Sequence, residues 1–69
     1  MELSQDDKAI LAHVVIDPDE WIKHALETVG EWAVTAKIER LKPEYLKEKE
    51  RLGDGYKTRA EREFEIKGV

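Results

Sequence analysis

Asp17-Pro18-Asp19-Glu20-Trp21, followed by an apolar-striped run to Val29, is the stretch that decides the fold, because it specifies the start of a helix. Asp17 is a good N-cap, since its carboxylate can accept from the free backbone N–H groups of the first turn. Pro18 then falls at the first helical position, where its missing N–H costs nothing and its φ is already helical. Glu20 follows three residues after the cap, as in a capping box, and acids here complement the helix dipole. A helix over 18–29 is therefore predicted.

The same stretch has a second interpretation, because Asp-x-Asp also opens calcium-binding loops. An EF-hand loop requires Gly at its sixth position and Glu at its twelfth. Counted from Asp17, these positions hold Ile22 and Thr28. The helix cap is therefore favoured, and we predict no metal site.

Working outward, the cap pattern recurs near both ends of the chain. Ser4 precedes Asp7 by three residues, and Thr58 precedes Glu61 by three. A hydroxyl N-cap with an acid at the third helical position is a typical helix start. The first of these helices runs into the β-branched stretch 14–16, which lowers helix propensity and favours fraying into an extended link.

Two residues interrupt the pattern in the middle of the chain. Gly30 either lies within a helix or ends one, and we predict a break there because the apolar stripe changes side. Pro43 removes a helical hydrogen bond and clashes with the preceding turn. A full stop and a kink both remain open at Pro43, because an apolar stripe stays in phase across it: Val34, Ile38, Leu41, Tyr45 and Leu52.

These signals predict an all-α fold, a small bundle of three to five short helices. The expected helices cover about 5–15, 18–29, 31–42, 44–52 and 59–65. We assign residues 1–69 to a single domain. Its part from about residue 53 is expected to dock loosely, because Ala60 and Phe64 are the only apolar members of the last predicted helix.

Composition narrows the class of protein. A chain of 69 residues buries only about 60% of its unfolded surface, and such chains often need a partner subunit to supplement the core. The absence of Cys excludes disulfides and thiolate metal sites. The apolar stretches 9–12 and 14–16 are far too short to cross a bilayer, and no secretion signal is visible. We expect a cytoplasmic protein that does not bind a membrane.

Charge is divided unevenly along the chain. The net charge is −4, but residues 1–35 carry −6 and residues 36–69 carry +2. Opposite patches steer encounter, so the two halves could associate head to tail. The alternative is a pair of solvated faces without a partner.

The sequence does not contain the combinations of residues that catalysis requires. Nucleophilic catalysis needs a hydroxyl or thiol activated by a neighbouring base, and Ser4 and Thr58 are better explained as caps. His13 and His24 lie on different predicted helices without the spacing of metal ligands. There is no Gly-rich phosphate loop, and a small chain has little room for a pocket. We expect no catalysis, no cofactor and no small-molecule substrate.

Nucleic-acid binding is a more serious rival, because a turn at Gly30 would make 31–42 the second helix of a helix-turn-helix. Its exposed residues would be Glu31, Thr35, Lys37, Glu39 and Arg40. This set is too acidic at the N-terminal end, which meets base edges. Phosphate binding requires clustered Lys and Arg, whereas those of the C-terminal half are interleaved with Glu. Nucleic acid is therefore not the expected partner.

The two tryptophans suggest a protein interface. Trp21 and Trp32 are eleven residues apart, about three helical turns, so a continuous helix would place them on one face. Tryptophan is enriched at interface hot spots; the alternative is that both fill the small core. We predict a homo-oligomer with an interface that includes Trp21, Trp32, Ile38 and Tyr45.

Three stretches together resemble a group of known proteins: 3–8 continued by 13–21, Ala36-Lys37-Ile38, and 56–62. They are similar to short proteins of tailed bacteriophages and prophages, encoded among tail-morphogenesis genes. The resemblance covers most of the chain and carries over no site, since no functional motif is defined for such proteins. It implies an accessory role in virion assembly, structural or chaperone-like, in the bacterial host cytoplasm or in the virion. A small helical regulator that binds nucleic acid or a host protein is the alternative.

Overall fold

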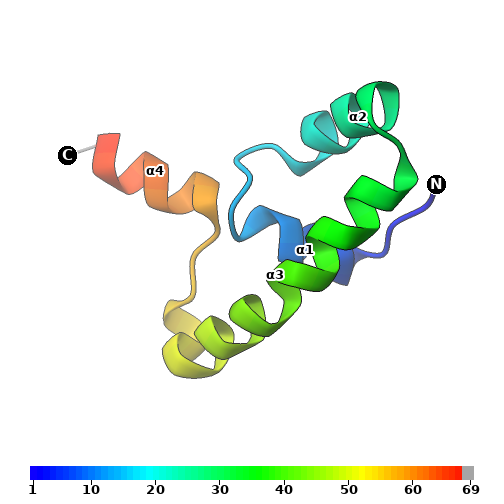
Figure 1. The fold of residues 1–69 in the computed structure, drawn as a ribbon. Coiled ribbons are helices and arrows are strands. Elements are labelled where there is room, and N and C mark those ends of the chain that lie inside the picture. The colour runs from blue at the N-terminus through cyan, green and yellow to red at the C-terminus, as the bar shows by residue number, and fades with distance from the viewer. Residues whose placement is uncertain (68–69) are drawn as a thin grey trace.

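The computed structural model describes residues 1–67, which fold into helices joined by short links (Figure 1). The helices are α1 (Gln5–Ala12), α2 (Pro18–Thr28), α3 (Glu31–Leu52) and α4 (Arg59–Lys67), with a 3₁₀ turn, η1 (Gly53–Gly55), between α3 and α4. The predicted all-α class is confirmed. The assignment of residues 1–69 to one domain stays a prediction, and it includes residues 68–69, which lie outside the described part.

The first two helix starts form as their sequence predicts. At α1 the Asp7 N–H donates to the Ser4 hydroxyl at 3.1 Å, and the Ser4 N–H donates to the Asp7 carboxylate at 3.3 Å. At α2 the Glu20 N–H donates to the Asp17 carboxylate at 3.2 Å, with Pro18 as the first helical residue. Both helix starts are confirmed.

The end of α1 differs from the prediction. The helix ends at Ala12 and not at residue 15. The N–H groups of Val14 and Val15 both donate to the Leu11 carbonyl, which closes the last turn. The chain turns at residues 13–14 and bends at Ile16 before it reaches the cap Asp17, so the helix ends where the β-branched residues begin, but the link is a turn and a bend where an extended one was expected.

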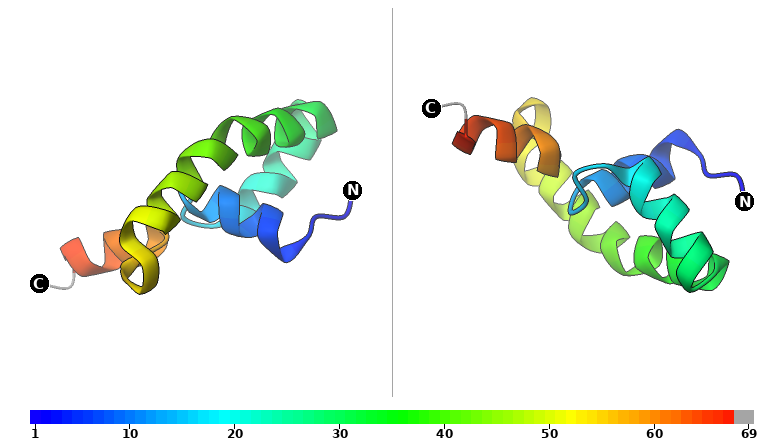
Figure 2. Two further views of the ribbon diagram at one scale, coloured as in Figure 1. Left: turned by 90° about the horizontal axis from the view of Figure 1, so that it is seen from below. Right: turned by 90° about the horizontal axis from the view of Figure 1, so that it is seen from above.

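The predicted break at Gly30 is confirmed. Helix α2 ends at Thr28, and the Gly30 N–H donates to the Ala25 carbonyl before α3 begins at Glu31. Gly30 has φ +135° and ψ 175°, a backbone conformation that is essentially confined to glycine. The chain therefore reverses here, and α2 packs against the N-terminal part of α3 (Figures 1 and 2).

Helix α3 runs without a stop through Pro43, so the separate helices predicted over 31–42 and 44–52 are wrong. The side chain of Pro43 is exposed, so the carbonyl that loses its hydrogen bond can be solvated. The apolar stripe on the inner face stays in phase on both sides of the proline, and its packing keeps the helix continuous.

A thin core lies where α1 crosses α3 and where α2 packs along it (Figure 2). Leu11 and Val34 are fully buried. The other buried apolar residues of the described part are Ile10, Ala25 and Ile38. After the far end of α3 the chain turns back, and α4 begins beside the link between α1 and α2 and points away from the core (Figure 1).

Candidate functional site

The four residues predicted to form an interface occupy different places. Trp21 is half-buried against the core, with the Lys37 ammonium 5.6 Å from its ring centre. Ile38 belongs to the core and is 8% exposed, and Tyr45 is half-buried beside it. Trp32 is 69% exposed. Because the helix breaks at Gly30, the two tryptophans do not share a helix face, and Trp32 is the only one of the four that is exposed.

Trp32 lies at the corner where α2 turns into α3. Val29, on the other side of Gly30, is 53% exposed. We call Val29 and Trp32 the corner surface. An indole ring is among the largest apolar groups in proteins, and here most of it faces water.

A second exposed apolar surface lies on α4. Phe64 is 77% exposed, and with Ala60 it lines a shallow hollow on the helix. Glu61 and Glu65 border this hollow, together with Lys57. We call Ala60 and Phe64 the α4 face.

An open groove of about 660 Å³ lies between α2, the 13–17 link and the start of α4. Its apolar wall comprises Val14, Val15, Ile16 and Trp21. The rest of the lining is polar and includes two acidic and two basic side chains together with His24. The groove can accept an apolar side chain flanked by charges.

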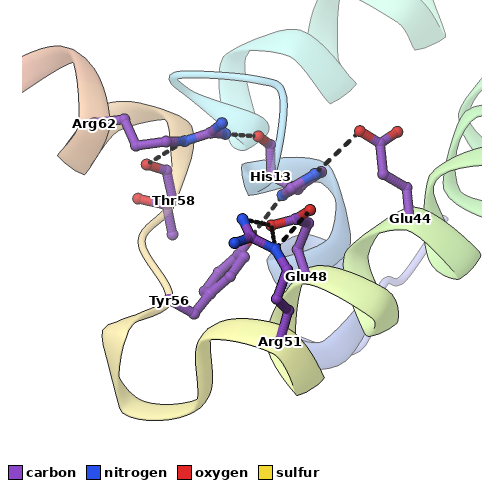
Figure 3. A network of polar contacts seen from close by, with 7 residues as sticks. All are labelled: His13, Glu44, Glu48, Arg51, Tyr56, Thr58 and Arg62. Carbon is purple, nitrogen blue, oxygen red and sulfur yellow. Dashed lines mark hydrogen bonds and ion pairs between the residues drawn. The ribbon is translucent and has the colours of Figure 1, made fainter.

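A polar network around His13 ties the C-terminal segment to the body (Figure 3). His13 is 5% exposed at the end of α1. Its Nδ1 lies 2.9 Å from the Tyr56 hydroxyl, and its Nε2 lies 3.5 Å from a carboxylate oxygen of Glu44 on α3. The Tyr56 ring also stacks on the imidazole, with centroids 5.8 Å apart, and Tyr45 meets it edge-on. Three distant segments of the chain therefore meet at one buried histidine.

One arginine extends this network, and a second forms an ion pair beside it. Arg62 of α4 donates to the backbone carbonyl of His13, as Figure 3 shows. Arg51 forms a two-pronged ion pair with Glu48 across one turn of α3, the closest N–O distance being 2.7 Å. The hydrogen bond from Arg51 holds the pKa of Glu48 below its ordinary value. Helix α4 is thus anchored chiefly at its N-terminal end.

The series Tyr56–His13–Glu44 has the order of a nucleophile, a base and an orienting acid. Its surroundings do not suit that chemistry. Burial raises the pKa of the Tyr56 hydroxyl, so the reactive phenolate is disfavoured. Neither Tyr56 nor His13 lines the groove beside α2 or the hollow on α4. We interpret the series as a structural anchor.

Two further features of residues 1–67 bear on possible ligands. No group of three or more His, Asp or Glu side chains lies close enough together to hold a metal ion. No helix in this part of the chain is long and apolar enough to cross a membrane.

The anchor around His13 and the groove were not identified from the sequence. Tyr56 is 43 residues from His13 and Arg62 is 49 residues from it, so no local spacing relates them. The only available signal was that the apolar run ending at residue 16 contains a lone histidine. The sequence predicted that the last helix would dock loosely, because only Ala60 and Phe64 are apolar there. The exposure of Phe64 agrees with this expectation.

Comparisons of the chain with protein-family models, with curated proteins and with solved structures find no match.

Proposed function

We propose that the protein is a non-enzymatic protein-interaction module that serves as an accessory or assembly factor of a tailed bacteriophage, structural or chaperone-like in action. The observation that supports protein binding is the exposure of Trp32. Its indole is 69% exposed beside the half-exposed Val29, whereas tryptophan is highly buried on average. Tryptophan is also the residue most enriched at the energetic centres of protein interfaces.

The balance between core and surface supports the same proposal. Five apolar side chains are buried among the described residues, whereas large apolar side chains at both the corner surface and the α4 face are exposed. Covering these groups with a partner would stabilise a chain whose own core is thin. The phage part of the proposal rests on the three sequence stretches that resemble phage and prophage proteins.

A nucleic-acid-binding regulator has less support. The α2–α3 pair is joined by a short turn, as a helix-turn-helix would be. The first turn of α3 carries the exposed Glu31, whereas Glu39 further along is followed by the exposed Arg40. The Glu31 carboxylate pairs with the N-terminal ammonium at 3.6 Å. Acidic groups at this end repel the phosphate backbone.

The test of the proposed function is genetic. The gene is deleted from the phage or lysogen that carries it, and infectious particles are counted after induction. We expect the titre to fall by at least about tenfold, with tail-defective particles visible by negative-stain electron microscopy. A plasmid copy of the wild-type gene should restore the titre.

The matched controls are two variants of exposed residues on either side of the α2–α3 turn. A copy carrying Trp32→Ser should fail to restore the titre, because the substitution removes the exposed indole without touching the core. A copy carrying Glu27→Ser should restore it. An undiminished titre in the deletion strain would contradict the assembly role, and full rescue by Trp32→Ser would contradict the role of the corner surface.

A further inference from the structure

The molecule is more open than a compact monomer of its size. Its radius of gyration is 12.7 Å, whereas a compact chain of this length has about 11 Å. It exposes 5223 Å², whereas the size scaling for monomers of 8.0 kDa gives about 4,450 Å². The excess, roughly 800 Å², is about what each partner contributes to a standard protein interface.

Part of the exposed apolar surface lies on α4 and at the groove beside it. Phe64 and Ile66 on α4 are each more than 70% exposed, and Ile16 at the wall of the groove is 57% exposed. The groove and the α4 face are both apolar, and each is left open in the single chain.

The charges at the two surfaces allow one new ion pair. Beside the α4 face, Lys57 pairs with Glu65, and at the rim of the groove Arg59 pairs with Glu63, so these groups are already partnered within the chain. Lys37 of the groove lies over the Trp21 ring and makes no ion pair within residues 1–67, and it can meet the exposed Glu61 that borders the α4 face. A helix with the α4 sequence therefore suits the groove in apolar character and brings one acid toward its lysine.

The chain's own α4 is not placed to be that occupant. Arg62 points toward the body, where it donates to the His13 carbonyl (Figure 3). Phe64 follows two residues later, about 200° around the helix, and therefore faces away from the body. Closing α4 onto its own groove would require turning the helix about half a revolution and breaking the Arg62 contact. The α4 of a second copy meets no such restriction.

We propose that two copies of this chain associate by exchanging α4 contacts, with Phe64 of each copy seated against Ile16 and Trp21 in the groove of the other. In a two-fold pair the same surface serves on both sides, so the α4–groove contact forms twice. The inference rests on the proposed function as a protein-interaction module, and it names a second copy as one partner.

The test asks whether two variants that cannot dimerise alone form a dimer when they are mixed. The molar mass is measured by light scattering after size-exclusion chromatography over a concentration series. The wild-type mass should rise with concentration from 8.0 kDa toward twice that value. Phe64→Ser and Ile16→Ser should each weaken the dimer by about a hundredfold or more, because each removes an apolar contact twice. Both residues are exposed, so circular dichroism should show unchanged folding.

The decisive measurement is made on a mixture of Phe64→Ser and Ile16→Ser. A Phe64→Ser chain retains its groove, and an Ile16→Ser chain retains its α4 face, so the mixed pair has one intact contact. We expect the mixture to form a dimer at concentrations where each variant alone is monomeric. Ile66→Ser, a similarly exposed position elsewhere on α4, should dimerise like the wild type.

Each other outcome overturns the inference. A wild-type chain that stays monomeric at all concentrations excludes the second copy as occupant. A dimer that survives Ile16→Ser but not Phe64→Ser indicates pairing of the two α4 helices and not docking in the groove. A mixture that remains monomeric excludes exchange. None of these results affects the titre assay with Trp32→Ser, so the inference and the proposed function can fail separately.

Discussion

His13 is the residue at which the N-terminal helix, α3 and the C-terminal segment meet. Its imidazole is buried, and both ring nitrogens face polar partners, Tyr56 and Glu44. A buried polar group costs free energy when its partner is removed, since it loses water without gaining a hydrogen bond. The anchor therefore stabilises the docking of the segment that carries α4.

Replacing Tyr56 by Phe tests the anchor. The substitution keeps the stacked ring and removes the hydroxyl that bonds His13 Nδ1. We expect a loss of about 1–2 kcal/mol in the free energy of unfolding, because a buried nitrogen is left unpaired. Urea denaturation provides the measurement. Tyr45→Phe is the control: its hydroxyl makes no hydrogen bond within the described residues, so a change within about 0.5 kcal/mol is expected.

The α4 cap makes a prediction about pH. The backbone and side chain of Thr58 hydrogen-bond the Glu61 carboxylate and hold its pKa below the ordinary 4.5. A carboxyl with a lowered folded-state pKa stabilises the helix above pH 4.5, and that contribution is lost as pH falls through the lowered value. Thr58→Ala removes the hydroxyl but keeps the backbone N–H that lowers this pKa most, so it should raise the pKa of Glu61 part of the way back to its ordinary value, as measured by carbon-detected NMR titration. Ser4→Ala, at the distant cap of α1, should leave it unchanged; a Glu61 pKa unaffected by Thr58→Ala would contradict the cap.

At the scale of elements, α3 retains a proline in its interior. Proline costs a helix interior about 3 kcal/mol relative to alanine. Pro43 is exposed and its neighbours on the inner face remain packed, so the helix continues through it. Pro43→Ala should therefore stabilise the protein, by about 1–3 kcal/mol, in urea denaturation. Glu50→Ala, another exposed position of α3, should have little effect. Destabilisation by Pro43→Ala would mean that the chain needs a stop at this point.

The turn between α2 and α3 depends on Gly30. Its φ of +135° is strained for any other residue, and an added Cβ would lie 3.4 Å from Trp32 Cδ1. Gly30→Ala should destabilise the fold by about 1–3 kcal/mol, as measured by thermal or urea unfolding. Gly55→Ala is the matched control, because no atom lies within 4 Å of its added Cβ and its φ is not positive. Equal stability of the two variants would show that α2 and α3 do not turn at Gly30 in solution.

Sequence reasoning succeeded where the determinants are local. The capping pairs and the Gly30 break depend on residues within one turn of each other, and the structure forms all of them. It failed at Pro43, because the local cost of proline was outweighed by packing of α3 against α1 and α2, which no single stretch specifies. The anchor around His13 could not be predicted, since its members are brought together only by the folded chain. The predicted interface contained both Ile38 and Trp32. Only the folded chain shows that Ile38 lies in the core and that Trp32 lies on the surface.

At the scale of the whole molecule, the arrangement buries few apolar side chains and exposes others at the corner surface, on α4, at the groove and on α3. The corner surface and the α4 face belong to different parts of the chain, so the two proposals, binding of a second copy through α4 and of another protein through Trp32, do not compete for one surface. This division agrees with an accessory protein that joins components. It also accounts for the thin core, which partners would supplement.

The most direct test of protein binding through Trp32 is site-specific photo-crosslinking during phage production. A photoreactive phenylalanine derivative is introduced at position 32, and in a parallel strain at the exposed control position Glu27. Cells are irradiated after induction, and the crosslinked products are identified by mass spectrometry. The proposed function predicts a discrete crosslink from position 32 to a virion or tail-assembly protein, with a much weaker one from position 27. Equal labelling from both positions, or products unrelated to the virion, would contradict it.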